Sequence, residues 1–519
     1  MGYMTKEMII RNCLAIENLF SKNVPKVTIL KYILALLSIK KASDLSREAH
    51  QIWDEIDETG EYSENLKKIG EKNIVLHHDF LVPETAYWNN IIQTELKIGD
   101  TLNRGFLDLI KNNKDRPCFL PFSHIDSDTI DFNSKLLGNQ SEKERLLTDA
   151  LHLISDLNLG NQDLNTQEDL DDAVDAIINH FIIQHPEFFI TPDSVTKLMI
   201  GLSELESNHI LVPEAGEGKI IRQITDNVTI PGIPKRKLPF KVVIPDKCLF
   251  FVTCMRAFLC EYVHLEIILG TISLESGLER NKLQNKILDH THVLGSIPLE
   301  TQKRTETEQE YIEGGPFSYG IPLNKKSEFS SLLGMWKYTV SGGKLVAAVP
   351  PQILYKERSE GQIRKNLITD DFIEAVIQLS PKLYLQNQAA YAVLIMRQFK
   401  TQERKKKILF IDAGKVFVEG KKQNTLSDEM IQEILIIYKN FKTVEGKSKV
   451  ATMKDVMECD YSLDVSRYVN PIKREKDEIN LMEKLNGLKR SSSEKSNLID
   501  LMINSLTNLE NLHQNVKSR

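Results

Sequence analysis

The sequence predicts an α/β protein in which a helical domain precedes a Rossmann-like, doubly wound domain and a helical tail. Three observations predict this order. Apolar residues recur at helical spacing up to about residue 185, short apolar runs then alternate with helix-length segments to about residue 425, and a charged segment follows. We therefore expect domains at residues 1–185, 186–470 and 471–519.

Composition bounds the class of protein. The chain has 519 residues, 41% of them hydrophobic and 27% charged, which is typical of a soluble globular protein. Its net charge of −6 excludes an overall basic field, so any contact with DNA would be local or made through a partner. The six cysteines form no Cys-x-x-Cys pair, no secretory signal is recognisable, and no apolar run reaches the length of a membrane span. We expect a cytoplasmic protein without a metal site or membrane segment.

The first part of the chain is predicted to be helical. Residues 32–37 form an apolar run, and Leu147, Leu151 and Ile154 follow one another at spacings of four and three. Residues 161–172 are acidic and rich in turn-forming residues, so we expect a loop there that leads into a helix beginning at Ala173.

Strands and helices alternate in the second part. A doubly wound sheet of this kind binds ligands at the carboxyl ends of its strands. Asp246 follows the second strand, where it is either an acceptor for ribose hydroxyl groups or an exposed loop aspartate. The predicted strands cover residues 211–213, 242–244, 292–294, 344–349, 375–379, 390–396 and 407–411.

The rest of the chain is organised around residues 189–218. They begin with Phe189-Ile190-Thr191-Pro192, continue with a helical run, and end with an apolar strand and the turn Gly216-Glu217-Gly218. A Gly-x-Gly turn after a strand lets backbone N–H groups approach a nucleotide-like ligand closely. It also occurs as a tight strand-to-helix turn that holds no ligand, and the turn alone does not separate the two.

This stretch resembles the cofactor-binding core of the modification subunits of type I restriction-modification systems, which are N-6 adenine DNA methylases that use S-adenosylmethionine. That family carries Phe-Tyr-Thr-Pro before a helix and then Asp-Pro-x-x-Gly-x-Gly; here Ile190 replaces the tyrosine and Val212 the aspartate. The resemblance implies that S-adenosylmethionine is held by Asp246 and by the matching residues Phe189, Thr191, Pro192, Pro213, Gly216 and Gly218.

The resemblance extends over nearly the whole chain, including the amino-terminal helical domain. It implies DNA methylation within a multisubunit complex for defence against phage DNA. The implied partners are DNA, a specificity subunit, and either a restriction nuclease subunit or a second methyltransferase-like subunit. Further segments in the order of the family are residues 342–350, 363–365, 375–379, 409–413 and 466–469.

The target-base motif departs from the family. Adenine-N6 methyltransferases carry Asn-Pro-Pro and an aromatic residue after the fourth strand, so that an amide accepts from the flipped base and a ring stacks on it. Here the motif is Ser296-Ile297-Pro298-Leu299, in which Ser296, Pro298 and Leu299 are the candidate catalytic residues. Losing the amide and the ring would cost roughly 2–6 kcal/mol, or about 30- to 10⁴-fold in rate.

Other charged segments leave alternatives open. Val212 cannot accept a hydrogen bond, so Glu214 or Glu217 could supply the missing carboxylate, unless both are solvated loop charges. The basic runs 235–237, 325–326 and 404–407 are either phosphate contacts or solvated turns. The polar loop 300–315 is too acidic for strong phosphate contact.

The tail carries a coiled-coil seam, which needs either the specificity subunit or residues 472–488 as its partner. The seam consists of Ile499, Met502, Leu506, Leu509, His513 and Val516.

Two functions therefore remain open. The first is an S-adenosylmethionine-dependent adenine-N6 methyltransferase subunit, and the second is a scaffold with the same fold whose chemistry is lost. A third, a Rossmann-like enzyme acting on a small molecule, explains the Gly-x-Gly turn but not the resemblance of the whole chain.

Overall fold

The computed structural model describes seven main segments, and its described residues belong to one compact unit that ends at Val469. The predictions for residues 300–315, residues 325–326 and the tail from residue 470 lie outside the described residues. The described segments are 5–59, 81–113, 129–160, 164–206, 209–270, 290–299 and 328–469, without the single positions 21, 23, 95, 186, 234, 263 and 386, and residues 125, 272, 319 and 320 are described as well.

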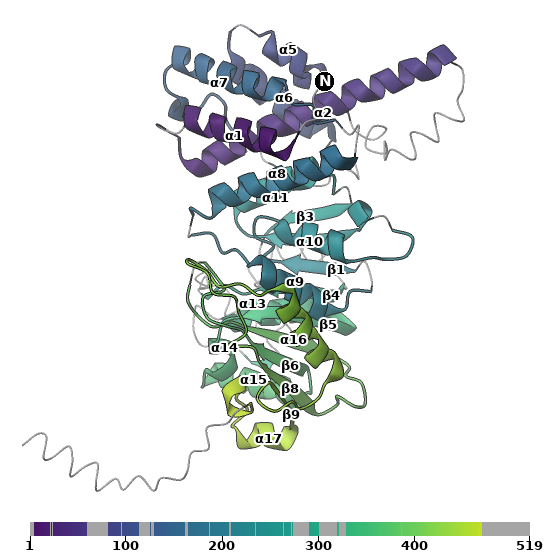
Figure 1. The fold of residues 1–519 in the computed structure, drawn as a ribbon, viewed down its shortest axis with the longest axis vertical. Helices are drawn as coiled ribbons and strands as arrows, with labels where there is room; N and C mark the ends of the chain where they lie inside the picture. The colour runs from purple at the N-terminus through teal and green to yellow at the C-terminus, as the bar shows by residue number, and fades with distance from the viewer. Residues whose placement is uncertain are drawn as a thin grey trace, which may run out of the picture. The chain divides into compact units, whose positions relative to one another are not determined.

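The amino-terminal part is helical, as predicted (Figure 1). Its helices bury apolar faces against one another, and the ring of Tyr32 stacks on Phe132 with centroids 5.1 Å apart. The helices are α1 (Lys6–Phe20), α2 (Lys26–Thr59), α5 (Trp88–Ile92), α6 (Ile98–Asn113), α7 (Gln140–Ser155) and α8 (Leu164–Ile182), with 3₁₀ turns at Glu84–Ala86 and Lys135–Leu137.

The predicted loop before Ala173 is wrong from Leu164 onwards, because α8 begins there. Its acidic residues suggested a solvated loop, but two of them face arginines elsewhere in the chain. Asp171 pairs with Arg236 and Asp172 with Arg222, each at 2.7 Å. The partner arginines lie far away in the sequence. Local composition therefore could not predict that these acidic residues are paired and that the segment is helical.

One mixed sheet follows, in the order β3-β2-β1-β4-β5-β7-β6-β8-β9. Every predicted strand is present, whereas β3 and β9 were missed. Pairing is parallel from β3 to β5 and between β6 and β8, and antiparallel at β5-β7, β6-β7 and β8-β9. The strands are β1 (Ile210–Pro213), β2 (Phe240–Ile244), β3 (Leu265–Leu269), β4 (His290–Ser296), β5 (Thr339–Val349), β6 (Ile373–Gln378), β7 (Ala392–Arg397), β8 (Lys407–Asp412) and β9 (Ser448–Thr452).

Helices cover both faces of the sheet, which confirms the doubly wound prediction. Adjacent strand residues alternate between two cores, so Leu211 and Val293 lie in one core while Val212 and Leu294 lie in the other. One face carries α9 (Asp193–Ser203), α10 (Lys219–Asn227), α11 (Lys247–Leu259) and α16 (Asp428–Asn440). The other carries α13 (Glu328–Lys337), α14 (Gln352–Tyr355) and α15 (Ser359–Thr369), while α17 (Met453–Glu458) follows β9 and 3₁₀ turns lie at Lys235–Lys237 and Val465–Arg467.

The order of the strands places a ligand site. The chain runs outward from β1 through β2 to β3, and then returns to add β4 on the other side of β1. Ligands of doubly wound folds bind at such a reversal, beyond the carboxyl ends of the strands. Here that point lies after Pro213 and Ser296, where the Gly-x-Gly turn and the target-base motif begin.

Within the described segments, no helix is long and apolar enough to cross a membrane. The same residues contain no group of three or more histidine, cysteine, aspartate or glutamate side chains placed to hold a metal ion.

Candidate functional site

The turn after β1 has a backbone that only glycine adopts readily. Gly216 has φ of 59° and Gly218 has φ of 83°, both in the left-handed region. A Cβ atom on Gly218 would lie 2.6 Å from Cγ2 of Thr253, whereas one on Gly216 would lie 3.5 Å from its nearest neighbour, Ile190. Gly218 is therefore required both by its conformation and by the close approach of α11.

Two side chains of α11 hold the carbonyl groups of this turn. Thr253 Oγ1 donates to the carbonyl oxygen of Gly216 at 3.2 Å, and Arg256 Nε donates to that of Glu217 at 2.9 Å. Thr253 and Arg256 lie three residues apart and therefore on one face of the helix. Both are fully buried, so water does not compete for these carbonyl groups.

The two glutamates of the turn are not solvated loop charges. Glu217 is buried, and Glu214 is partly buried with a left-handed φ of 55°. Burial raises the pKa of Glu214 to about 7 and also raises the pKa of Glu217, against the effect of the nearby Arg256. Gln223 Oε1 is buried nearby and has no hydrogen-bond partner among the residues that the structure describes. Hydrogen-bond acceptors thus gather beside the turn.

Two adjoining cavities lie at this point, and both are lined by Thr191, Asp193, Glu217 and Lys219. The smaller, of about 20 Å³, reaches Glu214, Gln223 and Ser296, so the stretch 189–218 and the predicted target-base motif meet there. The larger, of about 260 Å³, approaches the size of small-molecule pockets, which begin at about 300 Å³. It is also lined by Ile190, Pro192 and Ser194, by Asn179 and Ile182 of α8 and Ile183 directly after it, and by Leu385, Gln423, Asn424 and Thr425.

An aromatic cluster lies beside Ser296. Phe189 stacks on Tyr384 with centroids 5.5 Å apart and planes 10° apart, and Tyr384 stacks on Tyr391 at 4.0 Å. Ser296 Oγ lies 3.4 Å from the hydroxyl oxygen of Tyr384. Because both tyrosines come from the segment between β6 and β7, only the folded sheet brings them to the end of β4.

The remaining motif residues lie at the rim of this cluster. Pro298 and Leu299 are partly buried, and the backbone of Leu299 lies against the hydroxyl group of Tyr391. Burial raises the pKa of Tyr391 to about 12, so this hydroxyl stays protonated at neutral pH. The family carries an aromatic residue at the position of Leu299. Here aromatic rings lie nearby on Phe189, Tyr384 and Tyr391.

Asp246 lies at the end of β2 as the N-cap of α11. Its Oδ1 atom accepts from the backbone N–H groups of Cys248 and Leu249, both at 2.8 Å. The side chain is exposed. Because both capping bonds use Oδ1, Oδ2 is the oxygen that would accept from the ribose hydroxyl groups in the predicted contact.

Two of the basic runs have structural partners. Arg236 donates to Asp171 and to the carbonyl oxygen of Cys260, which ends α11. Arg404 pairs with Glu374 at 3.1 Å and lies over the rings of Tyr438 and Phe441. These two arginines therefore hold the fold together and are not simply parts of solvated turns, while the phosphate contacts considered for the two runs stay a prediction.

Two known domain families match the chain. The N-6 DNA methylase family matches residues 263–477, and the HsdM N-terminal domain matches residues 15–154. Together the two matches cover more than half of the chain. Residues 263–477 belong to the N-6 DNA methylase family. The boundary predicted between residues 185 and 186 lies between the two matches and stays a prediction, and so does the boundary at 470.

Individual relatives agree with this family. The type I restriction enzyme MjaVIII methylase subunit of Methanocaldococcus jannaschii is 37% identical over 164 residues, which are 31% of this chain and 28% of that protein. The MjaIX methylase subunit of the same organism is 24% identical over 325 residues, 60% of this chain and 56% of that protein. The matches thus span between about a quarter and somewhat over half of these relatives' lengths.

A solved structure shows the same fold. The methyltransferase subunit of a type I restriction-modification system from Streptococcus thermophilus superimposes with a TM-score of 0.71 at 19% identity, covering 90% of this chain and all of that one. At this identity the likeness shows the fold alone.

The methylase fold brings five of the ten predicted site residues together. Thr191, Pro213 and Ser296 line one cavity, Pro192 lines the adjoining one, and Phe189 joins the aromatic cluster. The other five do not line either cavity; they are Gly216, Gly218, Asp246, Pro298 and Leu299. Sequence reasoning missed Tyr384, Tyr391, Thr253 and Arg256, because each acts through a contact between distant segments. The one available signal was the presence of two tyrosines between β6 and β7.

Proposed function

We propose that this N-6 DNA methylase binds S-adenosylmethionine beyond the ends of β1 and β4 and methylates adenine N6 in DNA together with a specificity subunit. The observation that carries the proposal is the meeting of the glycine turn, Thr191 and Ser296 around one cavity, next to stacked aromatic rings. Glu217, which lies between the two glycines, lines this cavity together with the acceptors Glu214 and Gln223.

The residues present fit the cofactor. Its carboxylate suits the amino-terminal ends of α9 and α10, which have no side-chain cap and open beside Lys219. Its positively charged groups suit the carboxylates of Glu214 and Glu217, which take the place of the acid missing at Val212. When bound, S-adenosylmethionine supplies a methyl group on an electrophilic sulfonium.

The base pocket follows from the aromatic cluster. A flipped adenine would stack on the partly buried ring of Phe189, against which the buried Tyr384 packs, and the Ser296 hydroxyl would accept from its N6 amino group. One hydroxyl acceptor holds the amino group less firmly than an asparagine amide with a fixed plane. We therefore propose slow, rather than absent, methyl transfer.

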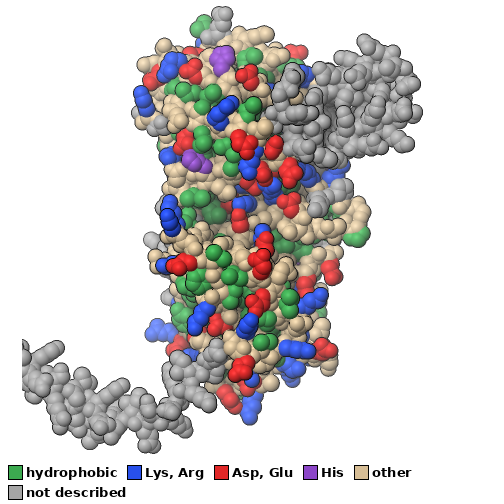
Figure 2. All heavy atoms as spheres, viewed as in Figure 1, with side chains coloured by type: hydrophobic (Ala, Val, Ile, Leu, Met, Phe, Trp, Pro, Cys, Tyr) green, Lys and Arg blue, Asp and Glu red, His purple; other side chains and the backbone are tan. Residues whose placement is uncertain are grey.

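The charge distribution supports a role for a partner in holding DNA. On the face shown in Figure 2, lysine and arginine side chains are interspersed with aspartate and glutamate. The chain as a whole carries a net charge of −6. DNA binding driven by phosphate contacts needs a local excess of basic side chains. We propose that a specificity subunit supplies it, and that a restriction nuclease subunit or a second methyltransferase-like subunit completes the complex.

The direct test is calorimetric titration of S-adenosylmethionine into the purified chain, followed by transfer of a labelled methyl group to DNA by the assembled complex. We expect binding that the Gly216→Asp, Gly218→Asp double variant abolishes while circular dichroism shows the fold intact. No binding to the unaltered chain at millimolar concentration would overturn the proposal.

Cofactor affinity should depend on pH through Glu214, whose pKa is about 7. As the pH rises through this value the carboxyl group loses its proton, so affinity for the cationic cofactor is expected to rise. The other charged groups on the same cavity are Asp193, Glu217 and Lys219. Calorimetry between about pH 6 and pH 8 measures the slope. Glu214→Gln should flatten it, and an unchanged slope in that variant would exclude Glu214 as its source.

The stability of the unliganded protein should show the opposite trend. The folded chain keeps the Glu214 proton up to about pH 7, whereas an ordinary glutamate loses it near 4.5. Between these values the folded state binds more protons than the unfolded state, so this group lowers the free energy of unfolding as the pH rises. Urea unfolding of the unaltered chain and of Glu214→Gln at both ends of the range measures the difference.

The alternative is a scaffold that keeps the fold within such a complex and has lost the chemistry. Two observations favour it. Val212 stands before Pro213, where the family carries an acid, and Ser296 has only a buried hydroxyl in place of an amide. It predicts that the assembled complex forms and binds DNA but transfers no methyl group. Methylation by the unaltered chain that disappears in the Gly216→Asp variant would exclude the scaffold.

A further inference from the structure

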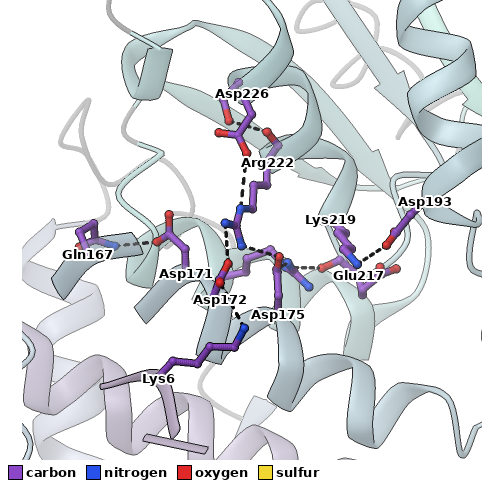
Figure 3. Close-up of polar contacts among 12 residues, drawn as sticks. Lys6, Gln167, Asp171, Asp172, Asp175, Asp193, Glu217, Lys219, Arg222 and Asp226 are labelled. Atoms are coloured by element: carbon purple, nitrogen blue, oxygen red, sulfur yellow. Dashed lines mark hydrogen bonds and ion pairs between the residues drawn. The ribbon is translucent and has the colours of Figure 1, made fainter. Parts of the chain in front are cut away.

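One carboxylate of α8 contacts two arginines that lead to the glycine turn. Asp175 Oδ2 accepts from Arg222 at 2.8 Å, and Asp175 Oδ1 pairs with the fully buried Arg256. Figure 3 shows Arg222 reaching from α10 towards Asp172 and Asp175 on α8. Asp175 is itself only 9% exposed, so both ion pairs are shielded from water.

Each arginine holds a different part of the turn. Arg256 Nε donates to the carbonyl oxygen of Glu217, the residue between the two glycines. Arg222 lies on α10, which begins at Lys219 directly after Gly218. Asp175 therefore acts on the middle of the turn through Arg256 and on the helix that leaves it through Arg222.

The contacts continue into the amino-terminal helices. Asp172 Oδ1 accepts from Arg222 at 2.7 Å, and Asp172 Oδ2 accepts from Lys6 of α1 at 3.2 Å. A continuous series of ion pairs thus runs from α1 through α8 to the turn (Figure 3). Burial opposes the charge of Arg256, but Asp175 and Glu217 outweigh it and raise the pKa of Arg256, so the arginine stays charged.

We propose that Asp175 is a positioning residue for the cofactor turn: through Arg256 and Arg222 it lets the amino-terminal helices set the geometry of the turn, and hence cofactor affinity. This inference rests on the proposed function, since the ligand whose affinity is set is S-adenosylmethionine. It assigns the helical part a direct role at the cofactor site, beyond packing.

The variant must separate positioning from folding. Asp175→Ala would leave Arg256 as a buried charge without its carboxylate, which is strongly destabilising. Asp175→Asn keeps the shape and an acceptor oxygen but removes the charge that orients both guanidinium groups. Asp226→Asn is the matched control, because Asp226 also pairs with Arg222, at 3.5 Å, but is 60% exposed.

The experiment is calorimetric titration of S-adenosylmethionine into the full chain in three forms: unaltered, Asp175→Asn and Asp226→Asn. We expect Asp175→Asn to bind about 10-fold more weakly and Asp226→Asn to stay within about 2-fold of the unaltered chain. Equal affinity of Asp175→Asn and the unaltered chain, with only a lower melting temperature, would overturn the proposal.

A second measurement needs no ligand. Amide hydrogen exchange should be faster over residues 214–220 in Asp175→Asn than in the unaltered chain, with strands β5 and β7 unchanged. A rise spread evenly over the whole protein would indicate a purely structural role and reject positioning. If the unaltered chain bound no S-adenosylmethionine, the proposed function would fail, while this measurement would still decide whether Asp175 holds the turn.

The double variant Asp175→Asn, Arg256→Met removes both buried charges. It should recover thermal stability relative to Asp175→Asn, because no unpaired charge remains. Cofactor affinity should stay low, because the carbonyl group of Glu217 has lost its donor. Recovery of affinity together with stability would show that the pair serves folding only.

Discussion

Replacing Ser296 by asparagine is expected to raise the rate of adenine methylation by about 10- to 100-fold, since it restores an amide acceptor worth roughly 1–3 kcal/mol. The structure gives the larger side chain room, because a cavity of about 20 Å³ borders Ser296. The measurement is single-turnover transfer of a labelled methyl group to unmethylated DNA by the complex with its specificity subunit.

Leu299→Phe is expected to add less than the sequence suggested. Tyr384 and Phe189 already provide stacked rings beside Ser296, so a further ring replaces surface that is partly present. We expect about a 10-fold increase in rate or less from this change.

Ser296→Ala is the matched control for Ser296→Asn and should be slower than the unaltered chain. If Ser296→Asn leaves the rate unchanged while S-adenosylmethionine still binds, the assignment of the base pocket is wrong.

Replacing Gly218 by alanine is expected to weaken cofactor binding on the order of 100-fold. A left-handed φ of 83° disfavours any side chain, and the new Cβ atom would lie 2.6 Å from Cγ2 of Thr253. Either the turn moves away from α11 or the helix shifts, and both change the carbonyl contacts of Thr253 and Arg256. Calorimetric titration with S-adenosylmethionine measures the loss.

Two variants show whether steric contact is the cause. Gly216→Ala shares the left-handed backbone, but its Cβ atom would meet nothing closer than 3.5 Å, so the expected loss is smaller, about 10-fold. Thr253→Ser removes Cγ2 and keeps the hydroxyl that donates to Gly216, so it should restore much of the affinity of Gly218→Ala. Equal losses in the two glycine variants, or no recovery with Thr253→Ser, would contradict this explanation.

Local pattern determined much of the fold. Short apolar runs predicted the buried strands, as at residues 344–349, because such runs suit a strand covered on both faces. The edge strand β9, Ser448–Thr452, was missed because it carries serine, lysine and threonine in place of a continuous apolar run. β3 was missed as well, since Glu266 interrupts its apolar residues and so short a run cannot be distinguished from a helix segment by periodicity.

The sequence by itself determined the fold class, the family resemblance and the glycine turn, because these depend on residue types at fixed short spacing. Only the tertiary structure decided that Tyr384 lies beside Ser296, that Glu217 is buried, and that Asp175 reaches the turn through two arginines. Each of these facts joins segments separated by tens of residues. The physical reason is that burial, ion pairing and ring stacking depend on which side chains the folded sheet and its covering helices bring into contact.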